Sequence, residues 1–474
     1  MVKVKDLYIN DSFEIKGDWY IPNTEQKKVS GILSFNEKGI YLDLFGSFNR
    51  DTLVSMRNNK YDFLHGFCED SILITLHNGF EIQHKFGIIE TTRLTFNFLF
   101  IGKHFNNIDE LMFHSVDIKY TYLEEWFDNR VFDFKFPRDG KLKDYTVSYN
   151  PPQDIFEVEI PSINTVIKGG YYFSTKAGHH KHTLIHQNCI SIIPKGEEQC
   201  SFKWFTETEN KFKGLLSFLM NRPIFQKQII AKGDYQERYK TREKIYIFPS
   251  KGLNFIEKEI NSSEVFISLS DIGSSLENVI NSWFDNKIEP TIENYIRTLY
   301  NGTSDTVTVF LNYTKALESF HRETSENSQY VTNSQYSKLR SKMIKAIEDE
   351  IDTEFKDKLR GALSYAHHYE FGKRLMHCFE DIDNEIKGII FTEHNVEILA
   401  NRIKQSRNYY THFGKKQEGV IDEGFDLYFT NILLKTVLFY WIAKELSFTD
   451  ELLKGWLDED YNLKDMLKRS LTLL

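Results

Sequence analysis

The chain has 474 residues, a formal net charge of -9 at pH 7 and 41% hydrophobic residues. The length predicts two or three domains, and the apolar fraction is sufficient to fill their cores. The negative charge excludes a protein that binds nucleic acid through its whole surface, so any such contact must be local.

The sequence has no feature typical of a secreted or membrane protein. Residues 1–11 lack an apolar signal core, and the longest apolar stretch, 431–443, is too short to span a bilayer and contains Lys435. The four cysteines are too scattered for a disulfide framework. We therefore expect a cytoplasmic protein with no membrane partner.

Short β-rich runs separated by turn residues fill the first half of the chain. Residues 29–48 form two alternating stretches around a turn, and Asn78-Gly79 within SILITLHNGFEI predicts another hairpin. One helix is expected at 209–221. The pattern predicts an antiparallel sandwich or barrel as the main structure of a domain covering residues 1–270.

From Ser274 onward the apolar residues recur at helical spacing. A final helix, at about 424–446, is expected to carry Phe425, Phe429, Ile432, Leu433 and Val437 on one apolar stripe. We therefore predict an all-α bundle over residues 271–474 and, for the whole chain, a two-domain α+β protein.

One segment of this acidic chain is strongly basic. Residues 398–417 contain no Asp or Glu but five cations, namely Arg402, Lys404, Arg407, Lys415 and Lys416. In a helix, Arg407 would lie on nearly the same side as Val396, Leu399 and Ile403. An arginine on a buried stripe either pairs with a carboxylate or opens into a groove where an anion binds.

His412 follows Arg407 by five residues. In a continuous helix its side chain would point about 140° away from that of Arg407. Gly414 is expected to end the helix, and an unwinding last turn would bring His412 beside the arginine. The two side chains could then hold a phosphodiester.

These residues carry a resemblance to a known family. The segment 407–412, RNYYTH, matches the R-x4-H motif, with Asn after the Arg, of HEPN-domain ribonucleases. KALESFHRE at 315–323 resembles the early helix of ApeA-like HEPN domains, while GDWYIP at 17–22 and GIYLDLFGSF at 39–48 resemble the ApeA N-terminal domain. The resemblance implies a prokaryotic anti-phage protein that cleaves RNA, is toxic to its cell and aborts infection.

The resemblance implies catalytic roles for Arg407, His412 and Asn408. RNA carries its own nucleophile, the 2′-OH, so the reaction needs proton transfer, for which His412 is suited, and charge stabilisation, for which Arg407 is suited. Asn408 would bind substrate or orient His412. No metal is required for this chemistry, and family members are expected to leave a 2′,3′-cyclic phosphate.

Other residues are expected to support the site. Glu318 would orient Arg407 or His412, although it would also suit a solvated ion pair with Arg322. The predicted RNA-binding residues are Arg402, Lys404, Tyr410, Lys415 and Lys416.

Two alternatives to this motif remain open. Arg407 would be structural if it paired with a buried Glu while His412 merely capped the helix. Arg360 and His367 form a rival R-x6-H, which has glycine where the motif has Asn408.

A second cluster suggests a metal. Residues 179–200 contain four histidines and two cysteines, and we take His182, His186, Cys189 and Cys200 as candidate zinc ligands. Their spacing fits no zinc pattern that we can name. The alternative is a polar loop followed by a buried strand that begins at Cys189. Any zinc is expected to be structural, because no Glu lies at H-E-x-x-H spacing.

Three functions therefore remain open. The first is a HEPN endoribonuclease whose N-terminal domain senses infection or restrains the nuclease. The others are a non-catalytic RNA-binding or adaptor protein and a metal-dependent hydrolase centred on residues 179–200. The expected partners are RNA, with tRNA as a candidate, a phage-encoded trigger and a second copy of the chain.

Overall fold

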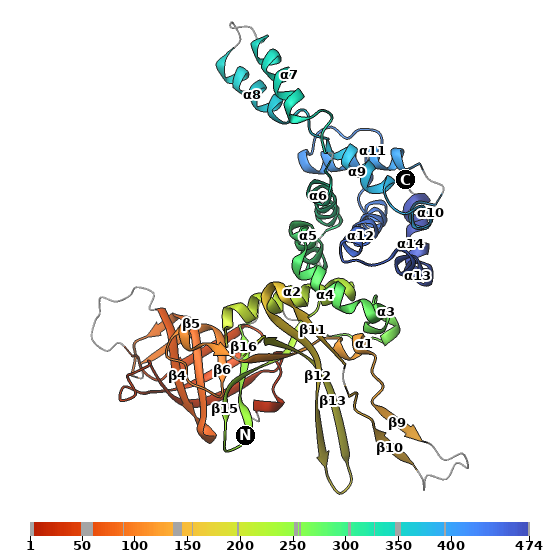
Figure 1. Cartoon of the computed structure of the whole chain (residues 1–474). Helices are drawn as coiled ribbons and strands as arrows, with labels where there is room; N and C mark the ends of the chain where they lie inside the picture. The colour runs from red at the N-terminus through yellow and green to blue at the C-terminus, as the bar shows by residue number, and fades with distance from the viewer. Residues whose placement is uncertain are drawn as a thin grey trace. The chain divides into compact units, whose positions relative to one another are not determined.

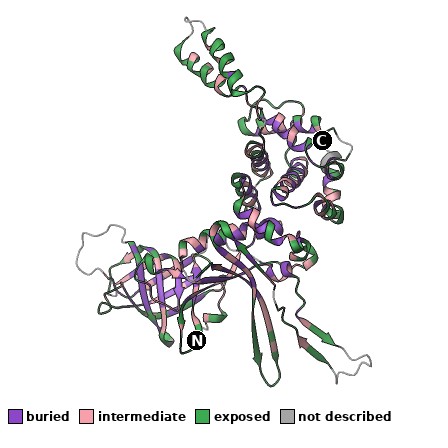
Figure 2. Cartoon of the chain, viewed as in Figure 1, coloured by how far each residue is buried: buried purple, intermediate pink, exposed green. Residues whose placement is uncertain are grey.

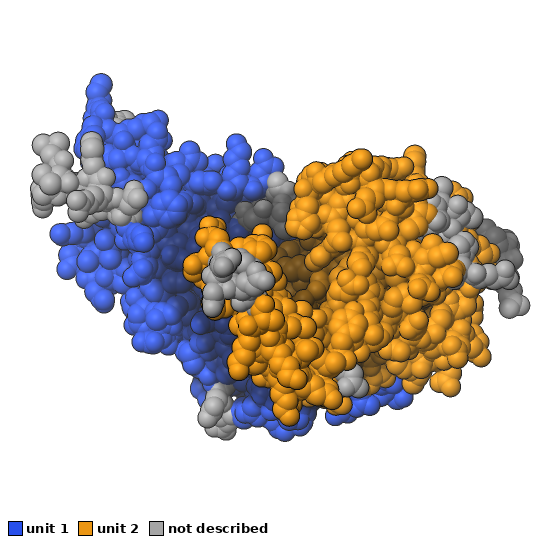
Figure 3. Space-filling view, turned by 90° about the horizontal axis from the view of Figure 1, so that it is seen from above, with its two compact units in different colours: residues 1–280 blue, residues 281–474 orange. Residues whose placement is uncertain are grey.

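The computed structural model describes residues 4–48, 60–88, 90–135, 145–153, 155–196, 199–250, 255, 257–301, 305–326, 328–346, 352–392 and 395–472. The chain divides into two compact units, Met1–Ile280 and Asn281–Leu474, which Figure 3 shows in different colours. The domain boundary expected from the sequence is 270/271, whereas the division into units falls within helix α4 (Leu276–Asp285).

The strands of the described chain all belong to the first unit (Figure 1). They are β1 (Phe13–Tyr20), β2 (Val29–Asn36), β3 (Gly39–Leu44), β4 (Lys60–Cys68), β5 (Ile72–Lys85), β6 (Thr91–Ile101), β7 (Met112–Phe113), β8 (Ser115–Tyr120), β9 (Phe132–Lys135), β10 (Thr146–Tyr149), β11 (Phe156–Ile160), β12 (Thr165–Ala177), β13 (His182–Pro194), β14 (Cys200–Ser201), β15 (Gln226–Gln236) and β16 (Thr241–Pro249).

Strands β1 to β6 form a closed antiparallel barrel. They pair in the order β6-β3-β2-β1-β4-β5, and β5 returns to pair with β6. Alternate residues point inward, so Trp19, Phe35 and Phe96 are buried in a continuous apolar core (Figure 2). The predicted β-rich, barrel-like first half is confirmed, including the hairpin of β2 and β3 within residues 29–48.

The predicted hairpin at Asn78-Gly79 is wrong. Strand β5 runs through both residues and pairs with β4 on one side and β6 on the other. Asn78 has a left-handed backbone, with φ of 55°, and a Cβ on Gly79 would lie 2.2 Å from Cδ1 of Phe96. The glycine is therefore required by close packing inside the barrel rather than by a turn.

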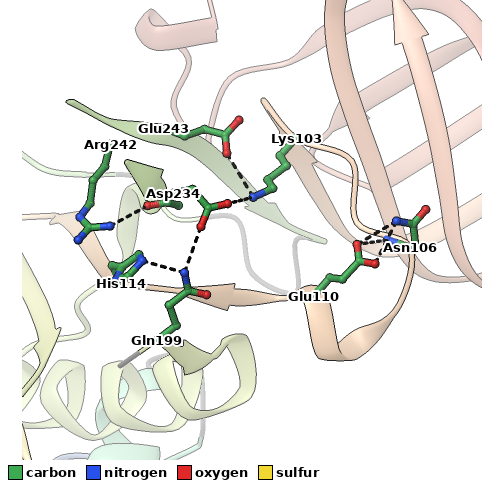
Figure 4. A network of polar contacts seen from close by, with 9 residues as sticks. Lys103, Asn106, Glu110, His114, Gln199, Asp234, Arg242 and Glu243 are labelled. Carbon is green, nitrogen blue, oxygen red and sulfur yellow. Dashed lines mark hydrogen bonds and ion pairs between the residues drawn. The ribbon is translucent and has the colours of Figure 1, made fainter. Parts of the chain in front are cut away.

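The sheet continues beyond the barrel through β16, β15, β8, β13, β12 and β11. Helix α2 packs against this part, and the Tyr120 hydroxyl donates to Oε1 of Glu209 on the helix at 3.1 Å. A polar network joins the strands of this part of the sheet to the segment that follows β6 (Figure 4). In it, Nζ of Lys103 lies 2.7 Å from Asp234 and 3.4 Å from Glu243, and Gln199 donates to Asp234 at 3.2 Å.

Helices make up the second unit, and the first unit contains helices as well as strands (Figure 1). They are α1 (Leu123–Phe127), α2 (Phe202–Leu219), α3 (Leu269–Ile272), α4 (Leu276–Asp285), α5 (Glu289–Tyr300), α6 (Thr306–Thr324), α7 (Asn333–Lys345), α8 (Thr353–Tyr365), α9 (Phe371–Glu380), α10 (Asn384–Phe391), α11 (Val396–His412), α12 (Phe425–Glu445), α13 (Asp450–Glu459) and α14 (Tyr461–Thr472).

Helix α6 is central to the second unit. It packs against α5, α9, α11 and α12, and its Phe310, Leu317 and Phe320 are buried. The predicted all-α bundle is confirmed. The final predicted helix is also present as α12. Leu433 and Val437 of its expected stripe are buried, but Phe425 is 80% exposed at the helix start. No helix among the described residues has the length and apolar character needed to cross a membrane.

Candidate active site

Helix α11 positions the predicted motif. Asn395 caps its first turn by accepting hydrogen bonds from the backbone N–H groups of residues 397 and 398, and Leu399 and Ile403 anchor one face in the core. The helix ends at His412. Phe413, with φ of 46°, adopts the left-handed conformation that ends the helix, one residue before the expected Gly414, and its N–H donates to the carbonyl of Tyr409 at 2.6 Å.

Arg407 lies between two helices and is about one-third exposed. Its Nη2 is 3.3 Å from Oε2 of Glu318 on α6, and its guanidinium lies 5.3 Å from the ring centre of Phe371 on α9. The other carboxylate oxygen of Glu318 accepts from Arg322 at 2.6 Å. The expected contact between Glu318 and Arg407 is therefore present, and the same carboxylate also makes the ion pair with Arg322.

His412 and Asn408 are exposed on the same helix. Because α11 stays helical through His412, the two motif ends keep the angular separation of a regular helix, about 140° for five residues. The His412 imidazole makes no hydrogen bond or ion pair within the described parts of the chain, so it does not cap the carbonyls of α11. It is open to solvent and to a ligand.

The predicted RNA-binding residues differ in their surroundings. Arg402 donates to the carbonyl of residue 419 at 3.3 Å, Lys404 pairs with Glu370 at 2.9 Å, and Lys416 pairs with Asp422. Lys415 is exposed and unpaired among the described residues. Two of these four cations, Lys404 and Lys416, are therefore paired with carboxylates.

Tyr410 contradicts its predicted role. Its side chain is buried, and its hydroxyl donates to the carbonyl of Ile421 at 2.7 Å. Burial raises the pKa of Tyr410 to about 12. A ring packed in the core cannot stack on a base, so Tyr410 holds the segment after α11 in place instead.

Two family models match the chain. ApeA N-terminal domain 1 matches residues 14–283, more than half of the chain, and Apea-like HEPN matches residues 311–452. The chain belongs to the ApeA-like HEPN family. This membership confirms the resemblance drawn from the sequence and supports a defence-related nuclease. No curated protein and no solved structure matches significantly.

The HEPN domain also contains a polar cluster that sequence reasoning missed. Arg374 of α9 is 3% exposed, and it donates from Nη1 to Nδ1 of His321 at 3.3 Å and from Nε to the carbonyl of Tyr369 at 2.9 Å. Nε2 of His321 lies 3.1 Å from Nδ1 of His377. Since the guanidinium only donates, His321 accepts at Nδ1 and donates from Nε2 to His377.

His321 lies in the core of the HEPN domain. It is 4% exposed, and burial, reinforced by the charges of Arg374 and His377, lowers its pKa to about 4. The imidazole is neutral at pH 7. No local sequence pattern reveals this cluster, because α6 and α9 are brought together only by tertiary packing.

The rival pair does not form a site in the HEPN domain. Arg360 pairs with Asp357 at 3.0 Å on the exposed side of α8. His367 is buried, and it stacks on Tyr336 and bonds through Nε2 to Oδ1 of Asn333 at 2.8 Å. The two side chains therefore have separate structural partners.

The candidate zinc ligands lie in the ApeA N-terminal domain and are not brought together. Residues expected to form a polar loop form instead the hairpin of β12 and β13, in which His182 pairs with Ala177, His186 with Phe173 and Cys189 with Gly170. Cys200 belongs to β14, which pairs with β7. Among the described residues, no group of three or more His, Cys, Asp or Glu side chains is placed to hold a metal.

Two of these residues have other partners. His186 contacts the Tyr149 hydroxyl at 3.0 Å and Oδ1 of Asn188 at 2.9 Å, and Cys189 is buried with its pKa raised to about 12, chiefly by burial. Because a zinc-bound cysteine must be a thiolate, this environment opposes ligation by Cys189.

Proposed function

We propose that this protein is a HEPN endoribonuclease that cleaves RNA without a metal and acts in anti-phage defence by abortive infection. Cleavage proceeds by attack of the RNA 2′-OH on the adjacent phosphorus, which releases the 5′-oxygen and leaves a 2′,3′-cyclic phosphate. We further propose a cytoplasmic homodimer, tRNA as a substrate class, and an N-terminal domain that responds to a phage-encoded trigger.

This proposal rests on the partners and the exposure of Arg407 and His412, which lie in the segment that matches the HEPN family model. Arg407 is held by Glu318 and Phe371 yet remains about one-third exposed, so its remaining N–H groups can bind phosphate oxygens. The His412 imidazole is exposed and makes no hydrogen bond or ion pair with the described residues. An acid–base group must be accessible in this way to reach a substrate. Asn408 lies on the exposed side of the same helix.

The chemistry divides between these residues. Arg407 stabilises the negative charge that develops on the phosphate in the transition state, while His412 exchanges a proton with the 2′-OH or the leaving 5′-oxygen. Glu318 orients the guanidinium and offsets its charge when RNA is absent. Nothing in these steps requires a metal-bound nucleophile.

The test is cleavage by purified Arg407→Ala and His412→Ala protein. We expect each variant to lose at least about 100-fold in rate while its thermal unfolding is unchanged, because both act on charge and proton transfer. Arg297→Ala is the matched control for the arginine, since Arg297 also pairs with a glutamate of the bundle, Glu293, at 2.8 Å. His179→Ala controls for loss of an exposed histidine.

Cleavage by His412→Ala protein at the wild-type rate would show that the assignment is wrong. Wild-type activity that is abolished by a chelator and restored by zinc would favour a metal-dependent hydrolase instead. An RNA-binding protein with no cleavage in any of these assays would favour the adaptor hypothesis.

A further inference from the structure

Two tyrosines and a lysine form an aromatic platform on the HEPN domain. Tyr330 lies in the segment before α7, and Tyr369 lies in the segment before α9. Their ring centres are 4.9 Å apart, and Nζ of Lys373 lies 4.8 Å from the first ring and 4.3 Å from the second. We call Tyr330, Tyr369 and Lys373 the tyrosine platform.

The platform is held by backbone pairing between segments far apart in sequence. Tyr330 donates its N–H to the carbonyl of His367 at 2.8 Å, and Tyr369 donates its N–H to the carbonyl of Ser328 at 2.9 Å. The buried guanidinium of Arg374 donates a hydrogen bond to the carbonyl of Tyr369. The rings are therefore preorganised, yet Tyr330 remains 52% exposed.

The platform is linked to the predicted motif through α6. Arg374, next to Lys373 in α9, contacts His321. One turn earlier on α6, Glu318 contacts both Arg322 and Arg407. The platform and the motif arginine are thus both held by side chains on neighbouring turns of α6, His321 and Glu318.

This region has an excess of cations. Arg322 and Arg407 share the single carboxylate of Glu318, and neither Lys373 nor Arg374 makes an ion pair with any residue that the structure describes. The whole chain, by contrast, has a net charge of -9. A local excess of cations beside an open aromatic ring favours a polyanion that also offers planar groups.

We infer that the tyrosine platform binds single-stranded RNA, stacking a base on Tyr330 while Lys373 and Arg322 contact the backbone that leads to Arg407. The inference rests on the proposed ribonuclease function, for which it supplies a substrate-binding surface. Duplex RNA fits less well, because its bases are already stacked and paired and cannot cover a tyrosine face. A protein partner would gain little from the unpaired cations unless it were strongly acidic.

The experiment measures binding, with cleavage prevented by His412→Ala in the full-length chain. The probe is a fluorescent single-stranded RNA of about twelve nucleotides, within the length that such surfaces cover. We expect Tyr330→Ala to weaken binding about tenfold, as loss of one stacked base does. Tyr330→Phe keeps the ring and should keep the affinity, which separates lost stacking from a damaged fold.

Lys373→Gln should reduce the slope of log affinity against log salt by about 0.7, the value for one phosphate contact on a single strand. A matched control exists on α14, where Lys464 lies 4.9 Å from the ring of Tyr461, which is 79% exposed. Lys464 already pairs with Asp458 at 3.5 Å. Tyr461→Ala and Lys464→Gln should therefore change RNA affinity less than twofold.

The inference would be overturned if the platform variants Tyr330→Ala and Lys373→Gln changed RNA affinity no more than the control variants Tyr461→Ala and Lys464→Gln. Unchanged RNA affinity in Tyr330→Ala protein would also overturn it. Unchanged RNA affinity together with loss of self-association in Tyr330→Ala protein would assign the platform to a protein contact instead. Failure of the proposed function is distinguishable, because it appears as a wild-type chain that cuts no RNA. The binding comparison can still be read in that case.

Discussion

At the scale of single residues, the two ion pairs of Glu318 determine how much of Arg407 remains available to a ligand. Its two oxygens go to different arginines, Arg322 at 2.6 Å and Arg407 at 3.3 Å, and its side chain is 16% exposed. The longer contact is to the motif arginine. Arg407 is therefore restrained but not saturated, and a phosphate can replace water around its remaining N–H groups.

Glu318→Gln tests this role. The amide retains one acceptor for Arg407 but removes the negative charge, so we expect RNA to bind as tightly or more tightly while kcat falls about tenfold, as is typical when an orienting partner is lost. Single-turnover cleavage and RNA titration measure the two effects separately. Glu293→Gln, which breaks the comparable pair with Arg297, should change neither. Equal rates for wild type and Glu318→Gln would leave Glu318 with no catalytic part.

At the scale of elements, the packing of α6 on α9 includes a buried titratable group. The pKa of His321 is lowered to about 4 by burial and then by Arg374 and His377, whereas an unfolded histidine titrates near 6.5. Between these values the unfolded chain binds a proton that the folded chain does not. The free energy of unfolding must therefore fall as the pH falls from 6.5 towards 4.

Urea unfolding at pH 7 and pH 5 measures this coupling. We expect the wild type to lose about 2 kcal/mol more than His321→Gln over this interval, since one pKa unit corresponds to about 1.36 kcal/mol. His182→Gln, at an exposed position of β13, should behave like the wild type. Parallel losses in wild type and His321→Gln would show that His321 is not the group responsible.

Individual strands and helices show which features of the fold are predictable from the sequence. The hairpin of β2 and β3 and helix α11 follow from local alternation, helical spacing and capping, so both were predictable. Asn78-Gly79 has the composition of a turn, but packing of Phe96 against Gly79 keeps it within a strand. Tertiary context decided that position.

The candidate site likewise contains residues that the sequence predicts and residues that it does not. Arg407 and His412 are recognisable because one helix carries both and their spacing is a motif. Arg374 could not be recognised, since its partner His321 is 53 residues earlier and the contact exists only once α6 and α9 pack. The predicted zinc site is wrong for a related reason. The pairing of β12 with β13 separates candidate ligands that are close in sequence.

At the scale of the whole molecule, the regularity of α11 bears on how many chains make one site. His412 stays on the helix, so within one chain its side chain diverges from Arg407 instead of swinging beside it. Cleavage by the 2′-OH needs a base, an acid and charge stabilisation at a single phosphate. A second copy related by a twofold axis would present the same helix end, and His412 of one chain would then lie at the phosphate that Arg407 of the other chain binds.

Mixing two inactive variants tests this arrangement. If each site takes Arg407 from one chain and His412 from the other, an Arg407→Ala/His412→Ala heterodimer has one intact site and one site lacking both residues. Equimolar mixing with free exchange makes half of the dimers heterodimers, so about a quarter of wild-type activity should return in a twofold-symmetric assembly. Analytical ultracentrifugation of the mixture would confirm that exchange occurred. No recovery after proven exchange, together with a fully active wild-type monomer, would place the whole reaction within one chain and require α11 to unwind beyond Arg407 when RNA binds.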